Sequence, residues 1–208
     1  FANKLRERVN TQGTAFLARA GLSEEAIEAF LAKFGVKVTK TKDNLLNAFT
    51  DGWKKEKILA IPKGERPNPS SYLKKSYINN HLAKFKEGAS FLVPKEALDR
   101  YGRSIVGRPD GQFVMSKIEM NNLLLKANRK LSIIEKELGI PKDMWKDKKL
   151  VRIDILNPEK FNLRLSNGNE SGVNELWLPG GKLPNGYSEA IVNPIPSGNY
   201  NESLIIIE

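Results

Sequence analysis

The sequence predicts an α+β protein, with an N-terminal helical bundle followed by a small antiparallel-sheet domain with packed helices. Apolar residues recur at helical spacing through residues 1–60, whereas apolar and polar residues alternate in residues 150–156. Residues 162–192 consist of short apolar runs between Gly, Pro and Asn turns, which is typical of short strands and loops. Because helices come first and strands concentrate later, the two kinds of element are expected to segregate as in α+β folds.

Residues 1–60 are expected to form a three-helix bundle. Ser23 followed by two glutamates is typical of a helix N-cap with an acidic first turn, and Gly35 suits the end of that helix. A third helix is expected to start near residues 41–43. Nothing in this region indicates catalysis.

Residues 61–71, IPKGERPNPSS, are interpreted as a Pro-rich linker, so that residues 72–208 form a separate domain. Three prolines and a glycine stop helices and disfavour packed strands. The alternative is a long ordered loop within one domain.

The second domain is predicted to contain helices followed by an antiparallel sheet. A helix with Ser71 near its N-cap is expected to bury Ile78, Leu82 and Phe85. The predicted helices cover residues 72–86, 116–127 and 132–138, and the predicted strands cover residues 89–93, 112–115, 150–156, 162–165, 175–178, 188–192 and 204–207.

The charge of the chain is uneven and favours a polyanionic partner. The formal net charge is +10, and residues 71–150 hold 17 Lys and Arg against 9 Asp and Glu, whereas residues 151–208 hold 4 against 7. A lysine-rich solvated surface is the simpler explanation. The chain has no cysteine, which excludes disulfides, thiolate nucleophiles and Cys-ligated zinc, and we expect no metal site and no cofactor. No apolar run reaches the roughly 18 residues that a membrane span needs.

His81 is the only histidine, so any histidine-based acid/base step must use it. It shares one helix side with Lys74, Tyr77 and Lys84, which makes these three residues candidate substrate-binding groups. A structural or simply exposed histidine is the alternative.

Three arginines are candidates for binding a phosphate. Arg108 lies in GRSIVGRPDGQF, between glycines and next to a Pro-Asp-Gly turn. Arg152 and Arg164 lie on the polar faces of predicted strands, where an arginine must meet Asp154, Glu170 or a substrate phosphate. Exposure on a hairpin explains Arg108 equally well.

The turns of residues 162–192 hold three carboxylates, Glu170, Glu175 and Glu189, and one tryptophan. Glu170 follows Asn-Gly-Asn, where a carboxylate serves either as a general base or as a cap for its own turn. Trp177 is a candidate for stacking on a base, with a place in the core as the alternative.

Several segments resemble the C-terminal toxin domains of bacterial polymorphic toxins of the contact-dependent growth inhibition type. The resemblance covers roughly residues 77–200 and includes FKEGASFLVPKEALDRYG, RPDGQFVMSK, LVRIDI, LSNGNESGVNELWLPGG and YSEAIVNPIPSG. It implies that residues 1–60 are a cytoplasm-entry module and that residues 72–208 are the effector. It further implies delivery as the C-terminal part of a larger secreted surface protein, action in the target-cell cytoplasm, and an immunity protein. Because the toxin is basic, we expect that partner to be acidic and to cover the face of His81 and Glu170.

Many toxins of this kind are ribonucleases with a barnase/EndoU/colicin/RelE-like fold, and tRNA is a frequent target, in some cases with a host translation factor. The resemblance therefore implies metal-independent RNA cleavage with His81, Glu170 and Arg152 at the centre. The alternative is an NAD glycohydrolase or ADP-ribosyltransferase. Arg100 or Arg108 would then bind the pyrophosphate, and Glu170, Glu175 or Glu189 would stabilise the ribosyl cation. Residues 151–208 contain no Glu-X-Glu pair, in which they depart from the transferases.

Overall fold

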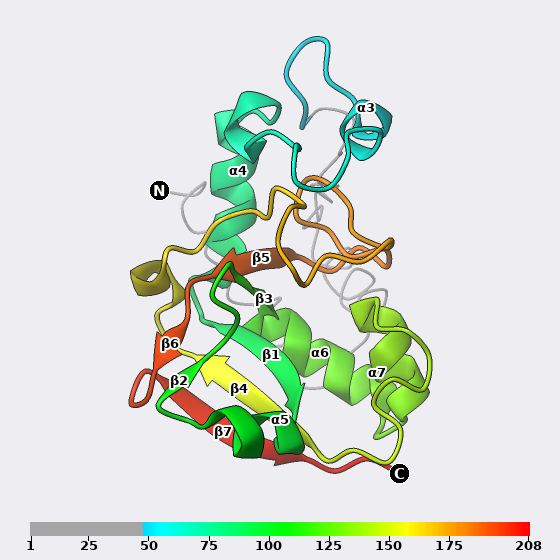
Figure 1. The fold of residues 1–208 in the computed structure, drawn as a ribbon, viewed down its shortest axis with the longest axis vertical. Coiled ribbons are helices and arrows are strands. Elements are labelled where there is room, and N and C mark those ends of the chain that lie inside the picture. Colours follow the sequence, from blue (N-terminus) through cyan, green and yellow to red (C-terminus); the bar gives the residue numbers. More distant parts are fainter. Residues whose placement is uncertain (1–47) are drawn as a thin grey trace, which may run out of the picture. The chain divides into compact units, whose positions relative to one another are not determined.

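The computed structural model describes residues 48–208, which lie within one compact unit, Leu45–Glu208. This unit is α+β, with a five-stranded antiparallel sheet and several helices (Figure 1). Most of the predicted N-terminal bundle lies outside the described residues. At its end, Phe49 forms a bridge to Leu73 and residues 51–52 turn, and the short helix α3, Lys55–Leu59, follows.

The main sheet has the order β5-β3-β1-β4-β7. The central strand β1, Ala89–Pro94, lies between β3, Gln112–Ser116, and β4, Leu150–Ile155. β5, Glu189–Val192, pairs with β3, and β7, Tyr200–Ile205, pairs with β4. All four pairings are antiparallel, as the sequence predicted for this domain.

β4 shows how the sequence pattern becomes a two-faced sheet. Val151, Ile153 and Ile155 enter one hydrophobic core, as the alternation predicted. Arg152 and Asp154 point to the opposite face, yet Arg152 is only 9% exposed. The sheet is therefore covered on both faces, which alternation in a single strand does not reveal.

Helices α6, Lys117–Ala127, and α7, Leu131–Leu138, lie together on one side of the sheet (Figure 1). Ser116 caps α6 by accepting a hydrogen bond from the backbone N–H of Glu119. The opposite face packs against α5, Lys95–Tyr101, and against Phe85 in the 3-10 helix η3, Ala83–Phe85. A separate two-stranded sheet, β2 (Ile105–Val106) with β6 (Ile195–Pro196), adds to that core.

Helix α4, Lys75–Leu82, starts later than predicted, with Lys74 rather than Ser71 at the N-cap. Ser71 instead ends a 3-10 turn, η2 (Pro69–Ser71), which the Asn68 side chain caps. The most deeply buried side of α4 and η3 carries Tyr77, His81 and Phe85, whereas Leu82 is only half-buried. The prediction was therefore correct for Phe85, whereas Ile78 and Leu82 are half-buried and the deepest positions belong to Tyr77 and His81.

The Pro-rich segment 61–71 is an ordered loop within the unit Leu45–Glu208. The Asn169 side chain accepts hydrogen bonds from the backbone N–H groups of Gly64 (2.8 Å) and Arg66 (3.2 Å). Arg66 in turn donates to the backbone oxygen of Gly168 (2.9 Å). These contacts favour the ordered loop, the alternative to a linker.

Residues 162–188 form loops rather than the predicted strands 162–165 and 175–178, so those two predictions were wrong. Outside the named strands, their ladder contacts are single bridges, Arg164 to Ile191 and Lys182 to Ser188. A short 3-10 helix, η4 (Pro158–Phe161), precedes them. Glycine and asparagine turns interrupt each apolar run before a ladder can form.

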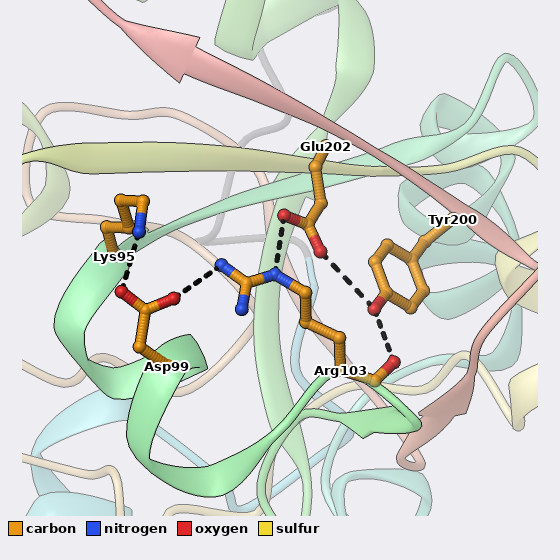
Figure 2. Close-up of polar contacts among 5 residues, drawn as sticks. All are labelled: Lys95, Asp99, Arg103, Tyr200 and Glu202. Atoms are coloured by element: carbon orange, nitrogen blue, oxygen red, sulfur yellow. Dashed lines mark hydrogen bonds and ion pairs between the residues drawn. The ribbon is translucent and has the colours of Figure 1, made fainter.

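A surface network joins α5 to β7 (Figure 2). Arg103 pairs with Asp99 (2.9 Å) and Glu202 (3.0 Å), and its backbone oxygen accepts the Tyr200 hydroxyl (2.7 Å). Hydrogen bonds from Lys95 and then Arg103 lower the pKa of Asp99. These groups are largely solvated, so the network fixes geometry more than it stabilises the fold. Among the helices of residues 48–208, none has both the length and the apolar character of a membrane span.

Candidate functional site

A pocket of about 200 Å³ opens on the side of the main sheet that carries α6 and α7. Residues of strands β1, β3 and β5 line it, together with residues 138–140, 145, 172–174, 176–177 and 182–184. This volume lies below the roughly 300–1,000 Å³ of sites that enclose a whole drug-sized ligand. The pocket therefore suits one group of a larger substrate.

Glu189, the first residue of β5, lines this pocket. Its side chain is half-buried, and among the described residues its carboxyl group has no hydrogen-bond or ion-pair partner. Burial raises the pKa of Glu189 to about 8, and the negative charge of Glu170 adds to the effect. Although part of the side chain faces the pocket space, the protein surrounds the carboxyl group closely enough to disfavour its charge.

Cationic and amide side chains converge on the same pocket. Arg108, Lys182, Gln112 and Asn174 line it. The Lys182 ammonium donates to the Gly186 oxygen (3.3 Å) and to the Ser188 hydroxyl (3.4 Å). A carboxyl group with a raised pKa, an arginine and a lysine thus share one cavity, which marks a candidate catalytic centre.

The loop that carries Arg108 is fastened to the opposite wall of the pocket. Asp110 accepts hydrogen bonds from the backbone N–H and the hydroxyl of Ser171, and these bonds lower its pKa. Gly172 lies against the Phe113 ring and the Arg108 guanidinium: a Cβ atom there would lie 3.2 Å from Phe113 Cδ2 and 3.3 Å from Arg108 Nε, so both would have to shift slightly. Arg108 is exposed, as its alternative interpretation expected, and it also lines the pocket.

The remaining wall is apolar and aromatic, which suits a flat, hydrophobic group such as a base. Phe113 and Met115 come from β3, and Trp145 and Trp177 come from loops. Trp177 is 7% exposed and donates from Nε1 to the Ser166 hydroxyl (3.1 Å), while the Arg66 guanidinium lies 4.7 Å from its ring centre. Trp177 therefore belongs to a hydrophobic core and also lines the pocket, and the Arg66 guanidinium covers one face of its ring.

Glu170 does not reach the pocket as a free base. It is 7% exposed and accepts the Ser166 hydroxyl (2.6 Å) and the backbone N–H groups of Asn167 (3.1 Å) and Gly168 (3.0 Å). These donors use the lone pairs that a general base needs. The catalytic assignment of Glu170 was wrong, and its other interpretation, a cap of its own turn, is correct.

His81 is fully buried, so it cannot touch a substrate. Its ring lies between those of Tyr77 (6.0 Å) and Phe85 (5.9 Å), and Nε2 lies 2.9 Å from the backbone oxygen of Glu189. The sequence correctly predicted that His81 meets the acidic, glycine-rich final third of the chain. It was wrong that an open cleft separates them, and the acid/base role of His81 is contradicted.

The neighbours of His81 on α4 do not form a substrate surface with it. Tyr77 is buried, and its hydroxyl donates to the Gly180 oxygen (2.7 Å), so its substrate-binding assignment was wrong. Lys74 is exposed and Lys84 is half-buried. Neither lysine lines the pocket.

Arg152 is committed to the interior of the protein. It donates to Asp154 (2.8 Å), Asn121 (2.7 Å) and the Ser90 hydroxyl (3.2 Å). The anion that an inward arginine requires is therefore Asp154, and the catalytic assignment of Arg152 was wrong. Arg164 donates to the Asn162 oxygen and the Asn193 side chain (both 2.9 Å) and does not line the pocket.

Sequence reasoning missed Lys182, Gln112 and Asn174, and it named Glu189 only in the alternative assignment. One signal was present: Lys182 and Glu189 flank the glycine turns of PGGKLPNGYSE, which bring distant positions together. Residues 48–208 contain no cluster of three or more carboxylate or imidazole groups suited to a metal ion. No protein-family model matches the sequence, and the comparison with curated proteins finds no relative.

Proposed function

We propose that this protein is the effector part of a bacterial toxin that cleaves RNA, with tRNA as the expected target and the Glu189 pocket as its catalytic centre. The observation that carries the proposal is that a carboxyl group with a pKa near 8 shares a pocket with Arg108 and Lys182. Glu189 takes the place of His81, Glu170 and Arg152, which the sequence had favoured.

The pKa of Glu189 suits proton transfer at neutral pH. A general acid or base works best when its pKa lies near the working pH, and an ordinary glutamate, at 4.5, lies well below it. At pH 7 the carboxyl group is mostly protonated, so it starts as the acid. Arg108 and Lys182 provide positive charge for the phosphate.

The surface beside the pocket is basic. Lys142, Lys146, Lys148 and Lys149 are exposed in the segment between α7 and β4, against two aspartates. Trp145, in the same segment, lines the pocket. A flexible polyanion that places one nucleotide in the pocket would extend along these lysines.

The proposed reaction breaks one P–O bond and forms another. The ribose 2′-oxygen attacks the phosphorus, the bond to the 5′-oxygen breaks, and Glu189 gives its proton to the departing oxygen. The proton released from the 2′-hydroxyl restores Glu189 through water. The products are a 2′,3′-cyclic phosphate and a free 5′-hydroxyl.

The resemblance to polymorphic toxin domains supports the same proposal. Under it the fold is of the barnase/EndoU/colicin/RelE-like kind, and the chain travels as the C-terminal part of a larger surface protein. The proposed immunity protein is acidic. Because His81 and Glu170 are buried, it would cover the Glu189 pocket and its lysines instead of those two residues.

One observation favours a second candidate function, consumption of NAD. Glu189 and Arg108 are members of the residue sets expected for that chemistry, and they line the same pocket. In this reaction Arg108 would bind the pyrophosphate, and Glu189, ionised beside the cationic nicotinamide ring, would stabilise the ribosyl cation.

The two functions are separated by incubating the purified chain with total tRNA and, separately, with NAD, each in the presence of EDTA. The wild type is compared with Glu189→Gln and with Glu175→Gln, in which an exposed carboxylate is lost instead. We expect cleaved tRNA with 2′,3′-cyclic phosphate ends, a loss of about 10²–10⁴-fold in Glu189→Gln, and unchanged activity in Glu175→Gln.

If NAD is consumed and tRNA stays intact, the result contradicts RNA cleavage and supports NAD consumption as the function of the pocket. RNA cleavage that survives Glu189→Gln contradicts the assignment of the centre, and failure to consume either substrate contradicts both functions.

A further inference from the structure

Helix α4 forms hydrogen bonds to two chain segments that lie next to each other, the start of β5 at Glu189 and the glycine turn at Gly180. His81 Nε2 lies 2.9 Å from the backbone oxygen of Glu189, and one helical turn earlier Tyr77 donates its hydroxyl to the oxygen of Gly180 (2.7 Å). Because a carbonyl oxygen only accepts hydrogen bonds, Nε2 must carry a proton here.

The packing around Gly181, where α4 meets the start of β5, is too close to admit a side chain at that position. A Cβ atom on Gly181 would lie 2.4 Å from Leu165 Cδ2, 2.6 Å from the Glu189 oxygen and 2.8 Å from His81 Nε2. Gly181 also has a φ of +70°, which favours glycine. The imidazole thus meets the Glu189 backbone across a position where only glycine fits.

The backbone next to the Glu189 carboxyl group is fixed from other directions as well. The Glu189 N–H donates to the Gly181 oxygen (2.7 Å). The preceding residue, Ser188, is fully buried and donates its N–H (3.0 Å) and its hydroxyl (3.1 Å) to the carboxylate of Glu119 on α6. By contrast with these backbone and Ser188 groups, the Glu189 carboxyl group has no polar partner among the described residues.

We propose that His81 is a positioning residue for Glu189: its buried imidazole holds the first residue of β5, so that the carboxyl group stays aimed into the pocket, and Tyr77 assists through Gly180. This inference rests on the proposed function for its catalytic consequence. His81 acts through Glu189 and never contacts the substrate.

The physical reason is that Glu189 is the first residue of β5, where the ladder with β3 begins, and the His81 hydrogen bond holds its backbone oxygen in addition to the contacts of its N–H and of Ser188. Met115 is the last β3 residue to pair with β5, opposite Glu189. A displacement of about 1 Å in a catalytic group can reduce a rate about 10²-fold. A side-chain hydrogen bond to the Glu189 oxygen supplies a fixed point where the ladder provides none.

The test compares His81→Leu, which removes the donor, with His81→Gln, whose amide places an N–H near the position of Nε2. Tyr77→Phe removes only the second hydrogen bond, and Asn80→Ala changes an exposed neighbour on α4 as the control. For each full-length variant, kcat and KM on RNA, the pH profile and the thermal midpoint are measured. The Glu189 carboxyl titration is followed by carbon-13 NMR, with Glu189→Gln identifying its signal.

We expect kcat to fall by about tenfold to a hundredfold in His81→Leu with little change in KM, and to recover most of that loss in His81→Gln. In His81→Leu the Glu189 titration should move toward the ordinary value of a glutamate by about one pH unit or more, because a displaced carboxyl group gains water. Tyr77→Phe should show a smaller shift in the same direction, and Asn80→Ala none.

Equal losses of kcat in His81→Leu and His81→Gln, with one limb of the pH profile removed, would show that His81 itself transfers a proton and overturn the inference. A lower thermal midpoint with unchanged kcat and Glu189 titration would show a purely structural role and also overturn it. If His81→Leu does not fold, the Glu189 titrations of His81→Gln and Tyr77→Phe decide. Because the NMR titration needs no substrate, it tests the positioning even if the chain cleaves neither RNA nor NAD.

Discussion

Two glutamates in the final third of the chain have opposite surroundings. Glu170 is buried, and a hydroxyl and two backbone N–H groups satisfy its carboxylate within its own turn. Glu189 lines a pocket, and among the described residues its carboxyl group has no polar partner. A buried charge with all its hydrogen bonds made is structural, whereas a carboxyl group left without them is available for chemistry. The difference teaches that hydrogen-bond partners, rather than residue type or burial, separate the two roles.

The largest expected effect is on activity, and it comes from Glu189→Gln. We expect turnover to fall about 10³-fold, because the amide cannot give up a proton. The free energy of unfolding at pH 8 should stay equal or rise, since the substitution removes a carboxyl group whose charge the site disfavours. Single-turnover kinetics and urea unfolding measure the two quantities. A large loss of stability in Glu189→Gln without a loss of turnover would show that Glu189, like Glu170, has a structural role.

Glu170→Ala should have the opposite effect, a loss of stability of about 3 kcal/mol, because three donors lose a charged acceptor. Urea unfolding measures this loss, and Glu175→Ala, which removes an exposed carboxylate from the next turn, should change stability by less than about 0.5 kcal/mol. If Glu170→Ala is as stable as the wild type, Glu170 does not organise its turn.

The pH dependence of stability should identify Glu189. Its pKa in the folded chain, about 8, lies above its ordinary value of 4.5, so between these values the folded state binds more protons than the unfolded state. Stability from this group is therefore fully present below pH 4.5 and is lost as the pH rises toward 8. We expect a loss on the order of 2 kcal/mol, reduced by the partial exposure of the side chain. Unfolding midpoints of wild type and Glu189→Gln between pH 5 and pH 9 check this, and the same slope in both proteins would assign it to another group.

The smallest expected effects come from two arginines, one beside each glutamate. Arg66→Gln should destabilise the fold by about 1 kcal/mol, because it loses the contact with the Trp177 ring and a hydrogen bond to Gly168. Arg108→Gln should leave stability unchanged and raise KM for RNA about tenfold, since that arginine serves the pocket. Thermal melts and steady-state kinetics on both variants test the pair. A raised KM in Arg66→Gln together with a loss of stability in Arg108→Gln would contradict the assignment of Arg66 to the fold and of Arg108 to the pocket.

The sequence by itself determined most of the element types in the second domain. The alternation in β4, the helix predicted over residues 116–127 and the strands predicted at β1, β3 and β5 rest on local patterns, and local patterns suffice where backbone preference and burial agree. The predictions of strands 162–165 and 175–178 were wrong because local alternation there resembled strands. Between the two segments, hydrogen bonds of Glu170, Asn169 and Arg66 hold residues 167–169 as a turn.

Only the tertiary structure decided which polar residues face the pocket. His81, Glu170 and Arg152 looked catalytic because their residue types are, yet each meets its partner across the fold or within a turn. Arg108, Lys182 and Glu189 come together only when the loop between β2 and β3 and the glycine turns close on the sheet. Residue type and spacing are local, whereas solvent access and hydrogen-bond partners depend on contacts between distant segments, so the elements were readable in the sequence and the site was not.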